Sequence, residues 1–207
     1  ISKKEFRAYA KENGHLTRGL DEQKNHMYLV GREEHGQISN RKALDSILSV
    51  ASGKKIDSDK PLVIVYYPGP DPCNKTGTND RERIRKRWKN LNKKLDYIAD
   101  ISVLNIAKTQ QGLGKYKGIV DWYIDPENTV EQLFYEYHYP CSSFTVISTT
   151  GKYISVFGEF DSDYILKAVQ LIQVRTFSSF SHEVSIPSDW ERFDWHGAKC
   201  YTPKAVY

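Results

Sequence analysis

The chain has 207 residues, of which 39% are hydrophobic and 27% are charged, with a formal net charge of +4. A chain of this length suits one sizeable core with added segments, and the composition is that of an ordinary globular protein without a large disordered block. No apolar run reaches the roughly 18 residues that a membrane-spanning helix requires, which excludes such a helix within these 207 residues.

The sequence leaves the cellular compartment open. It begins with Ile1 and shows no signal or transit segment. A chain that has lost a targeting peptide and a chain numbered from inside its gene both fit this start, so export, an organelle and the cytoplasm are all retained. The three cysteines do not decide between them, because they are too few for a disulfide scaffold and at least one is unpaired within the chain.

Residues 1–58 are expected to form a helix, a strand and a second helix, as an N-terminal extension that packs on the core. Ser2 is suited to cap the first helix and Gly14 to end it. Strand composition follows over 26–31, and the polar stretch 32–40 is typical of a loop. The second helix is indicated by apolar residues at helical spacing over 41–51. Asn40 is suited to cap it and Gly53 to end it.

Residues 61–67 are rich in Val, Ile and Tyr and are bounded by Pro and Gly, which is typical of a strand buried on both faces of a sheet. A proline-rich turn that ends at Cys73 follows. Five apolar side chains spaced four, three, four and three residues apart then predict one stripe of a helix: Ile84, Trp88, Leu91, Leu95 and Ile98. We expect any chemistry at this turn, where a strand feeds a helix past a cysteine.

The same helix is strongly basic. Residues 81–94 contain one acid, Glu82, among many lysines and arginines. Such a run could contact phosphates or an acidic partner, so nucleic acid is retained as a candidate partner. A solvated outer helix face is the favoured explanation, because solvent-facing helix positions are routinely charged. The basic residues of interest are Arg81, Arg85, Arg87 and Lys89.

The remaining elements include one long connection. Residues 108–128 exceed a typical connection, so we expect an insertion with a short helical turn at 119–123. A tight turn at Gly151 predicts an antiparallel hairpin. The expected strands are 101–107, 142–148 and 152–157, and the expected helices are 129–137 and one that begins at Asp161 or Ser162.

The C-terminal residues 175–207 show no periodicity but are rich in aromatic side chains, unlike a disordered terminus. We expect this tail to pack along the domain surface or onto another subunit. Exposed aromatic groups often mark interfaces, so Trp190, Phe193 and Trp195 are the expected partner-binding residues.

From residue 61 onward, the order strand, helix, strand, helix, hairpin, helix resembles the thioredoxin fold. The turn Pro70-Asp-Pro-Cys73 is similar to the Cys-x-x-Cys motif of that family, with the first cysteine replaced by proline and the internal proline kept. Tyr139 and Pro140, which precede Cys141, stand where the family has a cis-proline loop facing the redox turn. The resemblance covers about residues 61–173, and the strand near residue 28 is a candidate for the first strand of the family.

The resemblance implies an α/β fold in which a mixed sheet is flanked by helices. The expected organisation is an N-terminal extension over 1–58, a thioredoxin-like core over 59–174 that contains the 108–128 insertion, and an extended aromatic tail over 175–207. No cofactor is implied. The family's ordinary dithiol reaction is not available from the turn alone, because Pro70 has no thiol at the position of the usual nucleophile.

The resemblance also implies that Cys141 lies near Cys73, since residues beside the family's proline lie against the start of the helix after the central strand. Two cysteines can cross-link when their Cα atoms lie within about 7 Å. One hypothesis is a switchable disulfide between them. The other, which is favoured, is a structural disulfide or two buried thiols, because free cysteine is among the most buried residue types.

Metal binding is a further alternative. His138 and Cys141 are three residues apart, Cys73 is expected near them, and His196 and Cys200 are four residues apart. Thiolate and imidazole ligands suit zinc or copper. Because none of these spacings matches a standard zinc finger or ribbon, no metal site is expected.

The leading hypothesis is a redox-degenerate thioredoxin-like module that acts by binding a protein partner, as a subunit or accessory of a larger assembly. The alternative is an enzyme, an atypical thiol–disulfide oxidoreductase or peroxidase that uses Cys73 with Cys141 as the resolving partner. Peroxiredoxins also place a cysteine after a strand that ends in Tyr-Pro, as Tyr67 and Pro68 do here. Their supporting Thr and Arg are not recognisable at matching spacing.

Overall fold

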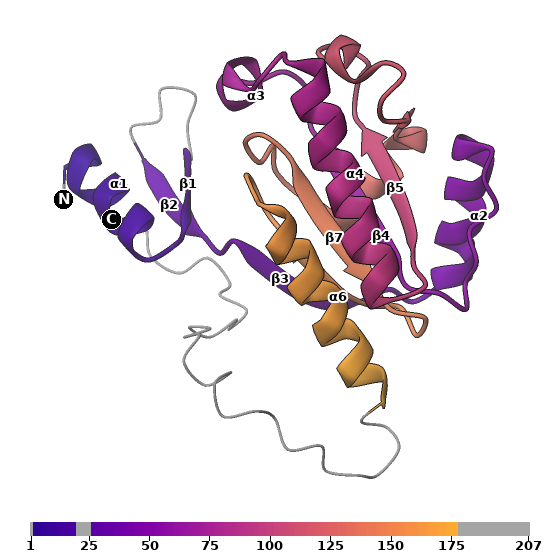
Figure 1. The fold of residues 1–207 in the computed structure, drawn as a ribbon. Coiled ribbons are helices and arrows are strands. Elements are labelled where there is room, and N and C mark those ends of the chain that lie inside the picture. The colour runs from indigo at the N-terminus through magenta and orange to yellow at the C-terminus, as the bar shows by residue number, and fades with distance from the viewer. Residues whose placement is uncertain (1, 20–25, 178–207) are drawn as a thin grey trace. The chain divides into compact units, whose positions relative to one another are not determined.

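The computed structural model describes residues 2–19 and 26–177 (Figure 1). The chain divides into two compact units, and the division falls between Glu34 and His35. Five residues singled out in the sequence lie outside the described ranges: Trp190, Phe193, Trp195, His196 and Cys200.

The first unit holds one helix and a two-stranded antiparallel sheet. Its elements are α1 (Lys3–Glu12), β1 (Leu16–Gly19) and β2 (Met27–Val30). The predicted start of the helix is confirmed, because Ser2 Oγ accepts from Glu5 N and Ser2 N donates to the Glu5 carboxylate at 2.8 Å. This capping box satisfies backbone donors that the first helical turn leaves without partners. Strand β1 was not predicted.

The second unit is built on a six-stranded mixed sheet. The strands of this sheet are β3 (Glu33–Gln37), which spans the division between the units, β4 (Leu62–Tyr67), β5 (Ser102–Ala107), β6 (Trp122–Ile124), β7 (Ser143–Ile147) and β8 (Lys152–Val156). They lie in the order β3-β8-β7-β4-β5-β6. The central strand β4 is buried along its whole length, as its apolar sequence predicts. It runs parallel to β5 and antiparallel to β7, where Tyr66 lies opposite Ser143.

Helices cover both faces of this sheet. The helices and helical turns are α2 (Arg41–Ser52), α3 (Pro72–Thr76), α4 (Arg81–Ile98), η1 (Gly114–Tyr116), η2 (Pro126–Asn128), α5 (Thr129–Phe134) and α6 (Ser162–Phe177). Figure 1 shows α4 and α6 on one face, where Val63 and Val65 of β4 share a core with Leu95. Side chains alternate along a strand, so Tyr66 points to the other face, where it stacks on Tyr135 beside α5.

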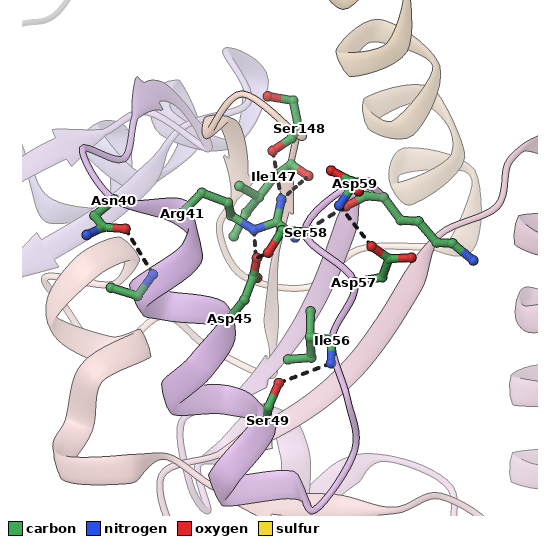
Figure 2. Close-up of polar contacts among 12 residues, drawn as sticks. Asn40, Arg41, Asp45, Ser49, Ile56, Asp57, Ser58, Asp59, Ile147 and Ser148 are labelled. Atoms are coloured by element: carbon green, nitrogen blue, oxygen red, sulfur yellow. Dashed lines mark hydrogen bonds and ion pairs between the residues drawn. The ribbon is translucent and has the colours of Figure 1, made fainter.

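A buried ion pair ties α2 to the sheet (Figure 2). Arg41 Nε donates to Asp45 Oδ1 at 2.7 Å, and the two side chains are 5% and 4% exposed. The other guanidinium nitrogens donate to the carbonyl oxygens of Ser148 and Lys60 at 2.7 and 3.3 Å. Ser58 Oγ donates to the second carboxylate oxygen of Asp45. Helix α2 therefore belongs to the sheet unit.

Local sequence signals predicted the limits of α2 correctly. Asn40 Oδ1 accepts from Ala43 N at 3.0 Å at the start of the helix. Gly53 follows the last turn with a left-handed φ of 65°, a conformation that glycine adopts without steric cost. The expected cap of α6 is also confirmed, because Asp161 Oδ1 accepts from Asp163 N at 2.8 Å.

Two predictions for irregular segments are wrong. The expected loop 32–40 contains strand β3, and the expected helical turn at 119–123 is replaced by the approach to strand β6. Both are edge strands, whose hydrogen bonds come from a single neighbour far along the chain. Strand β6 lies parallel to β5, with Trp122 opposite Asn105, and the Trp122 ring packs against Tyr67.

The strand order and connections are those of a thioredoxin-like fold. β4, α4 and β5 form a crossover between parallel neighbours, β7 and β8 form an antiparallel hairpin beside β4, and α6 covers the same face as α4. The expected α/β fold, with a mixed sheet flanked by helices and an N-terminal extension, is confirmed. No helix within the described residues is both long and apolar enough to cross a membrane.

Candidate functional site

Two cysteines that are distant in sequence meet at one end of the interior strands β4 and β7. Cys73 lies in α3, just after the turn that follows β4, and Cys141 lies in the loop that leads into β7. They form a disulfide across a sequence separation of 68 residues, with a Cα–Cα distance of 5.1 Å. That distance is usual for disulfides. The predicted proximity of the two loops is therefore confirmed, and both cysteines are partly exposed.

The loop before Cys141 differs from the expected cis-proline loop. No peptide bond within the described residues is cis, so the expectation for the bond between Tyr139 and Pro140 is wrong. A bond that precedes proline favours trans by about 0.5–1 kcal/mol unless the surroundings select cis. Cys141 itself takes a left-handed φ of 68°, which a non-glycine residue adopts only where its surroundings hold it. Tyr139 is buried and stacks on Phe157 with 4.2 Å between ring centroids, which anchors the loop.

Asp71 joins the two cysteine loops without a covalent bond. Its side chain is 7% exposed, and one oxygen accepts from Asn74 N at 2.7 Å, which caps α3. The other oxygen accepts from Cys141 N at 2.9 Å and forms a hydrogen bond with His138 Nε2 at 3.2 Å. Sequence reasoning missed this role. The Asp-Pro pair ahead of Cys73 is a recognisable helix start, but it does not reveal a contact with a loop 70 positions away.

A second acidic group, Glu159, lies beside the disulfide. A carboxylate oxygen of Glu159 and the sulfur atoms of Cys73 and Cys141 all lie within 4.8 Å of one another. Glu159 follows strand β8, and the preceding Gly158 N donates to Ser143 Oγ at 3.1 Å, which fixes the end of the hairpin against β7. Sequence reasoning missed Glu159, because only the register of β7 and β8 brings it to the cysteines.

The insertion 108–128 packs beside the turn that carries Cys73. Tyr67 Oη donates to the carbonyl oxygen of Gln111 at 3.2 Å, and Lys115 Nζ donates to the carbonyl oxygen of Asn74 at 3.4 Å. Burial raises the pKa of Tyr67, so its hydroxyl remains a donor at neutral pH. The insertion thus contacts both ends of the turn between β4 and α4.

Two of the four basic residues of interest on α4, Arg81 and Arg87, form hydrogen bonds with other segments of the protein. Arg81 donates to the carbonyl oxygens of Lys115 and Lys117 at 3.1 and 2.7 Å, and Arg87 donates to the carbonyl oxygen of Phe160 at 3.3 Å. The other two basic residues of interest, Arg85 and Lys89, are exposed. Contact with nucleic acid stays the less favoured alternative for this helix.

No family model and no curated protein matches the chain. Among solved structures, the chain is similar to a pneumococcal exposed lipoprotein thioredoxin (Etrx1) from Streptococcus pneumoniae, with 18% identity over 55% of this chain and 86% of that chain and a TM-score of 0.37. A DsbF homologue from Corynebacterium diphtheriae is 16% identical over 75% of this chain and 92% of that chain, with a TM-score of 0.38.

A mitochondrial 2-Cys peroxiredoxin from Plasmodium falciparum is also similar. It is 14% identical over 83% of this chain and 96% of that chain, with a TM-score of 0.36. These likenesses concern the fold. The strand order and register described above establish the thioredoxin-like fold by themselves.

Proposed function

We propose that this protein takes part in thiol–disulfide exchange, with Cys73 and Cys141 as its redox pair. The observation that carries the proposal is the partly exposed disulfide between α3 and the loop before β7. It lies beyond the strand ends where β4 ends and β7 begins. A disulfide is reduced by in-line attack of a thiolate on one of its sulfur atoms, so access to the bond is the first requirement.

The exchange balances in two steps. A substrate thiolate attacks one sulfur, forms a mixed disulfide and releases the other cysteine as a thiolate. A second substrate thiolate then attacks the substrate sulfur of the mixed disulfide, which releases the second cysteine and leaves the substrate oxidised by two electrons. The protein gains those two electrons and, overall, two protons. In the reverse direction the reduced pair reduces a substrate disulfide.

Asp71 supports this cycle because its contacts do not involve sulfur. Its hydrogen bonds to Asn74 N and Cys141 N link the two loops in the absence of the disulfide. After reduction the thiols therefore stay near each other, and ring closure does not require a search through unfolded conformations. This arrangement uses cysteines from separate loops, so the missing thiol at Pro70 does not prevent exchange.

A redox titration tests the proposal. The protein, with Cys200→Ser to remove the third thiol, is equilibrated in thiol–disulfide buffers of stepped potential, and free cysteines are counted by alkylation and mass. We expect a reduction potential above about −300 mV, because structural disulfides of secreted proteins typically lie below that value. In Cys73→Ser and in Cys141→Ser, the remaining cysteine should attack a small aromatic disulfide, form a mixed disulfide with one half of it and release the other half as a thiol. A bond that stays oxidised throughout the folded range would contradict the proposal.

A module that acts by binding alone is the second candidate. It is favoured by one observation, the proline at position 70 in place of the usual nucleophile. On this proposal the disulfide is structural and serves only to stabilise the folded state. The same titration separates the two candidates, since a purely structural disulfide requires a reduction potential below about −300 mV.

A further inference from the structure

We propose that the reduced form of this protein binds one thiophilic divalent metal ion, Zn²⁺, through Cys73, Cys141 and Glu159. The three ligand atoms are the two sulfurs and a carboxylate oxygen, which lie within 4.8 Å of one another in the disulfide form. The inference rests on the proposed function in one respect, because the disulfide must open before the sulfurs can bind a metal.

The geometry of the three groups suits zinc after a small change. Zinc binds sulfur at about 2.3 Å and carboxylate oxygen at about 2.0–2.2 Å with tetrahedral angles, which places two ligand sulfurs roughly 3.8 Å apart and a sulfur and an oxygen roughly 3.5 Å apart. The carboxylate oxygen lies within 4.8 Å of both sulfurs, so a change of the Glu159 side-chain rotamer is the movement that has to bring it to the zinc distance. With the Cα atoms 5.1 Å apart, rotation about the Cα–Cβ bonds can separate the reduced sulfurs while the backbone stays in place.

The ligand types select the metal. Thiolate sulfur favours zinc and other thiophilic ions over magnesium and calcium, which prefer all-oxygen sites. Two thiolates and one carboxylate bring three negative charges to the ion, which more than offset its double positive charge. Three protein ligands leave the fourth tetrahedral position to water, the pattern of an open rather than a closed zinc site.

The backbone segments that carry the three ligands are held by contacts that do not involve the sulfur atoms, and the Glu159 side chain is exposed. Asp71 accepts from Cys141 N and caps the helix that carries Cys73, so it fixes both sulfur-bearing segments. Ser143 Oγ accepts from Gly158 N directly before Glu159. Outer contacts of this kind orient metal ligands, and their loss typically lowers affinity about 10–100-fold.

Metal binding and the disulfide exclude each other. A dithiol reductant gives two electrons to the disulfide and becomes a cyclic disulfide, and the protein gains two thiols. Zinc then replaces the two thiol protons, which are released to solvent. Because zinc binds only the reduced form, it shifts the redox equilibrium toward that form, and oxidation to the disulfide releases the ion.

The first experiment measures zinc binding by competition with a chromophoric chelator. The full chain with Cys200→Ser is reduced with a phosphine, desalted without oxygen, and its thiols are counted in parallel. We expect one zinc per reduced chain and no binding at that site in the oxidised protein. Co²⁺ in place of zinc should give the sulfur-to-cobalt charge-transfer bands and the visible bands of a tetrahedral thiolate site. This measurement needs no ligand variant, so it does not depend on whether such a variant folds.

Variants assign the ligands. Cys73→Ser and Cys141→Ser should each abolish tight binding, and Glu159→Gln should weaken it about tenfold or more. Glu127→Gln, which removes an exposed carboxylate outside the cluster, should leave it unchanged. Two free thiols without zinc binding, or equal affinity of Glu159→Gln and the parent, overturn the metal site alone. A disulfide that the phosphine cannot open in the folded protein overturns both the metal site and the proposed exchange.

Discussion

Arg41 and Asp45, one helical turn apart on α2, form an ion pair that is almost completely shielded from solvent. The guanidinium also donates to carbonyl oxygens of Ser148 and Lys60, so one side chain connects three segments of the chain (Figure 2). Taking charges out of water is costly, and such a pair is tolerated only because its hydrogen bonds are satisfied.

Removing one partner of this pair should strongly destabilise the protein. Arg41→Met leaves the Asp45 carboxylate buried without its cation, and we expect the free energy of unfolding to fall by about 3–5 kcal/mol. Urea denaturation of Arg41→Met, Asp45→Leu and the double variant measures this. The double variant should lose less than the sum of the single changes, whereas simple additivity would contradict the coupling. Lys42→Met, at an exposed neighbour, is the control.

Asp71 should control how fast the disulfide re-forms. Asp71→Ala removes a helix cap, which costs about 1 kcal/mol, and leaves Cys141 N without its acceptor. The variant is reduced, the reductant is removed rapidly, and an oxidant is added. The disulfide between Cys73 and Cys141 should then form more slowly in the variant than in the parent.

Asp80→Ala provides the matched control for that experiment. Asp80 caps α4 by accepting from Glu82 N and Arg83 N, both in that helix. The control should lower stability by a similar amount and leave the rate of disulfide formation unchanged. Equal slowing in both variants would mean that Asp71 acts only as a helix cap.

Asp125 should make part of the stability depend on pH. Burial raises the pKa of its carboxyl above the ordinary value of 3.8, although its oxygens accept from Val130 N and Glu131 N. The native state therefore holds this proton to higher pH than the unfolded state does. Between the ordinary and the raised pKa the native state binds more protons, so this group lowers the free energy of unfolding as pH rises.

Asp125→Asn removes this contribution and tests the sign. The free energy of unfolding of the parent should exceed that of the variant by most at acidic pH. This excess should shrink as the pH rises through the raised pKa of Asp125. Urea denaturation across the acidic to neutral range gives this difference, with Glu127→Gln as an exposed control. A difference that grows with pH would show that the carboxyl is stabilised in its charged form instead.

The disulfide should contribute strongly to global stability. Because it closes a loop of 68 residues, opening it should lower the free energy of unfolding by about 4 kcal/mol in the chain-entropy model. Urea denaturation of the Cys200→Ser protein with and without reductant measures the difference. Cys73→Ala together with Cys141→Ala should match the reduced protein, and a much smaller difference would indicate that the unfolded chain is already compact.

Features set by neighbouring residues could be predicted from the sequence. Ser2, Asn40 and Gly53 mark helix ends because a cap is a contact over three or four residues, and the apolar run of β4 predicts burial on both faces. The proximity of Cys73 and Cys141 was also predicted, but it came from a resemblance in the order of elements.

Features set by distant pairing could not be predicted in the same way. The edge strands β3 and β6 are short, and each exists through one remote neighbour. The third member of the cysteine cluster, Glu159, is placed by the hairpin register. The bond before Pro140 was expected to be cis from a family pattern, and it is trans. The prediction failed because a motif of three residues does not determine which isomer the surrounding loop selects.

The link between Cys73 and Cys141 makes a covalent ring of everything between them, including β5, the insertion and α5. A protease that cuts once inside this ring leaves a single molecule while the bond is intact, and two separate fragments after the bond is reduced. The same cut outside the ring releases a fragment in both states. The disulfide thus determines whether a cleavage in the insertion leaves the strands of the sheet covalently connected or divides them between two fragments.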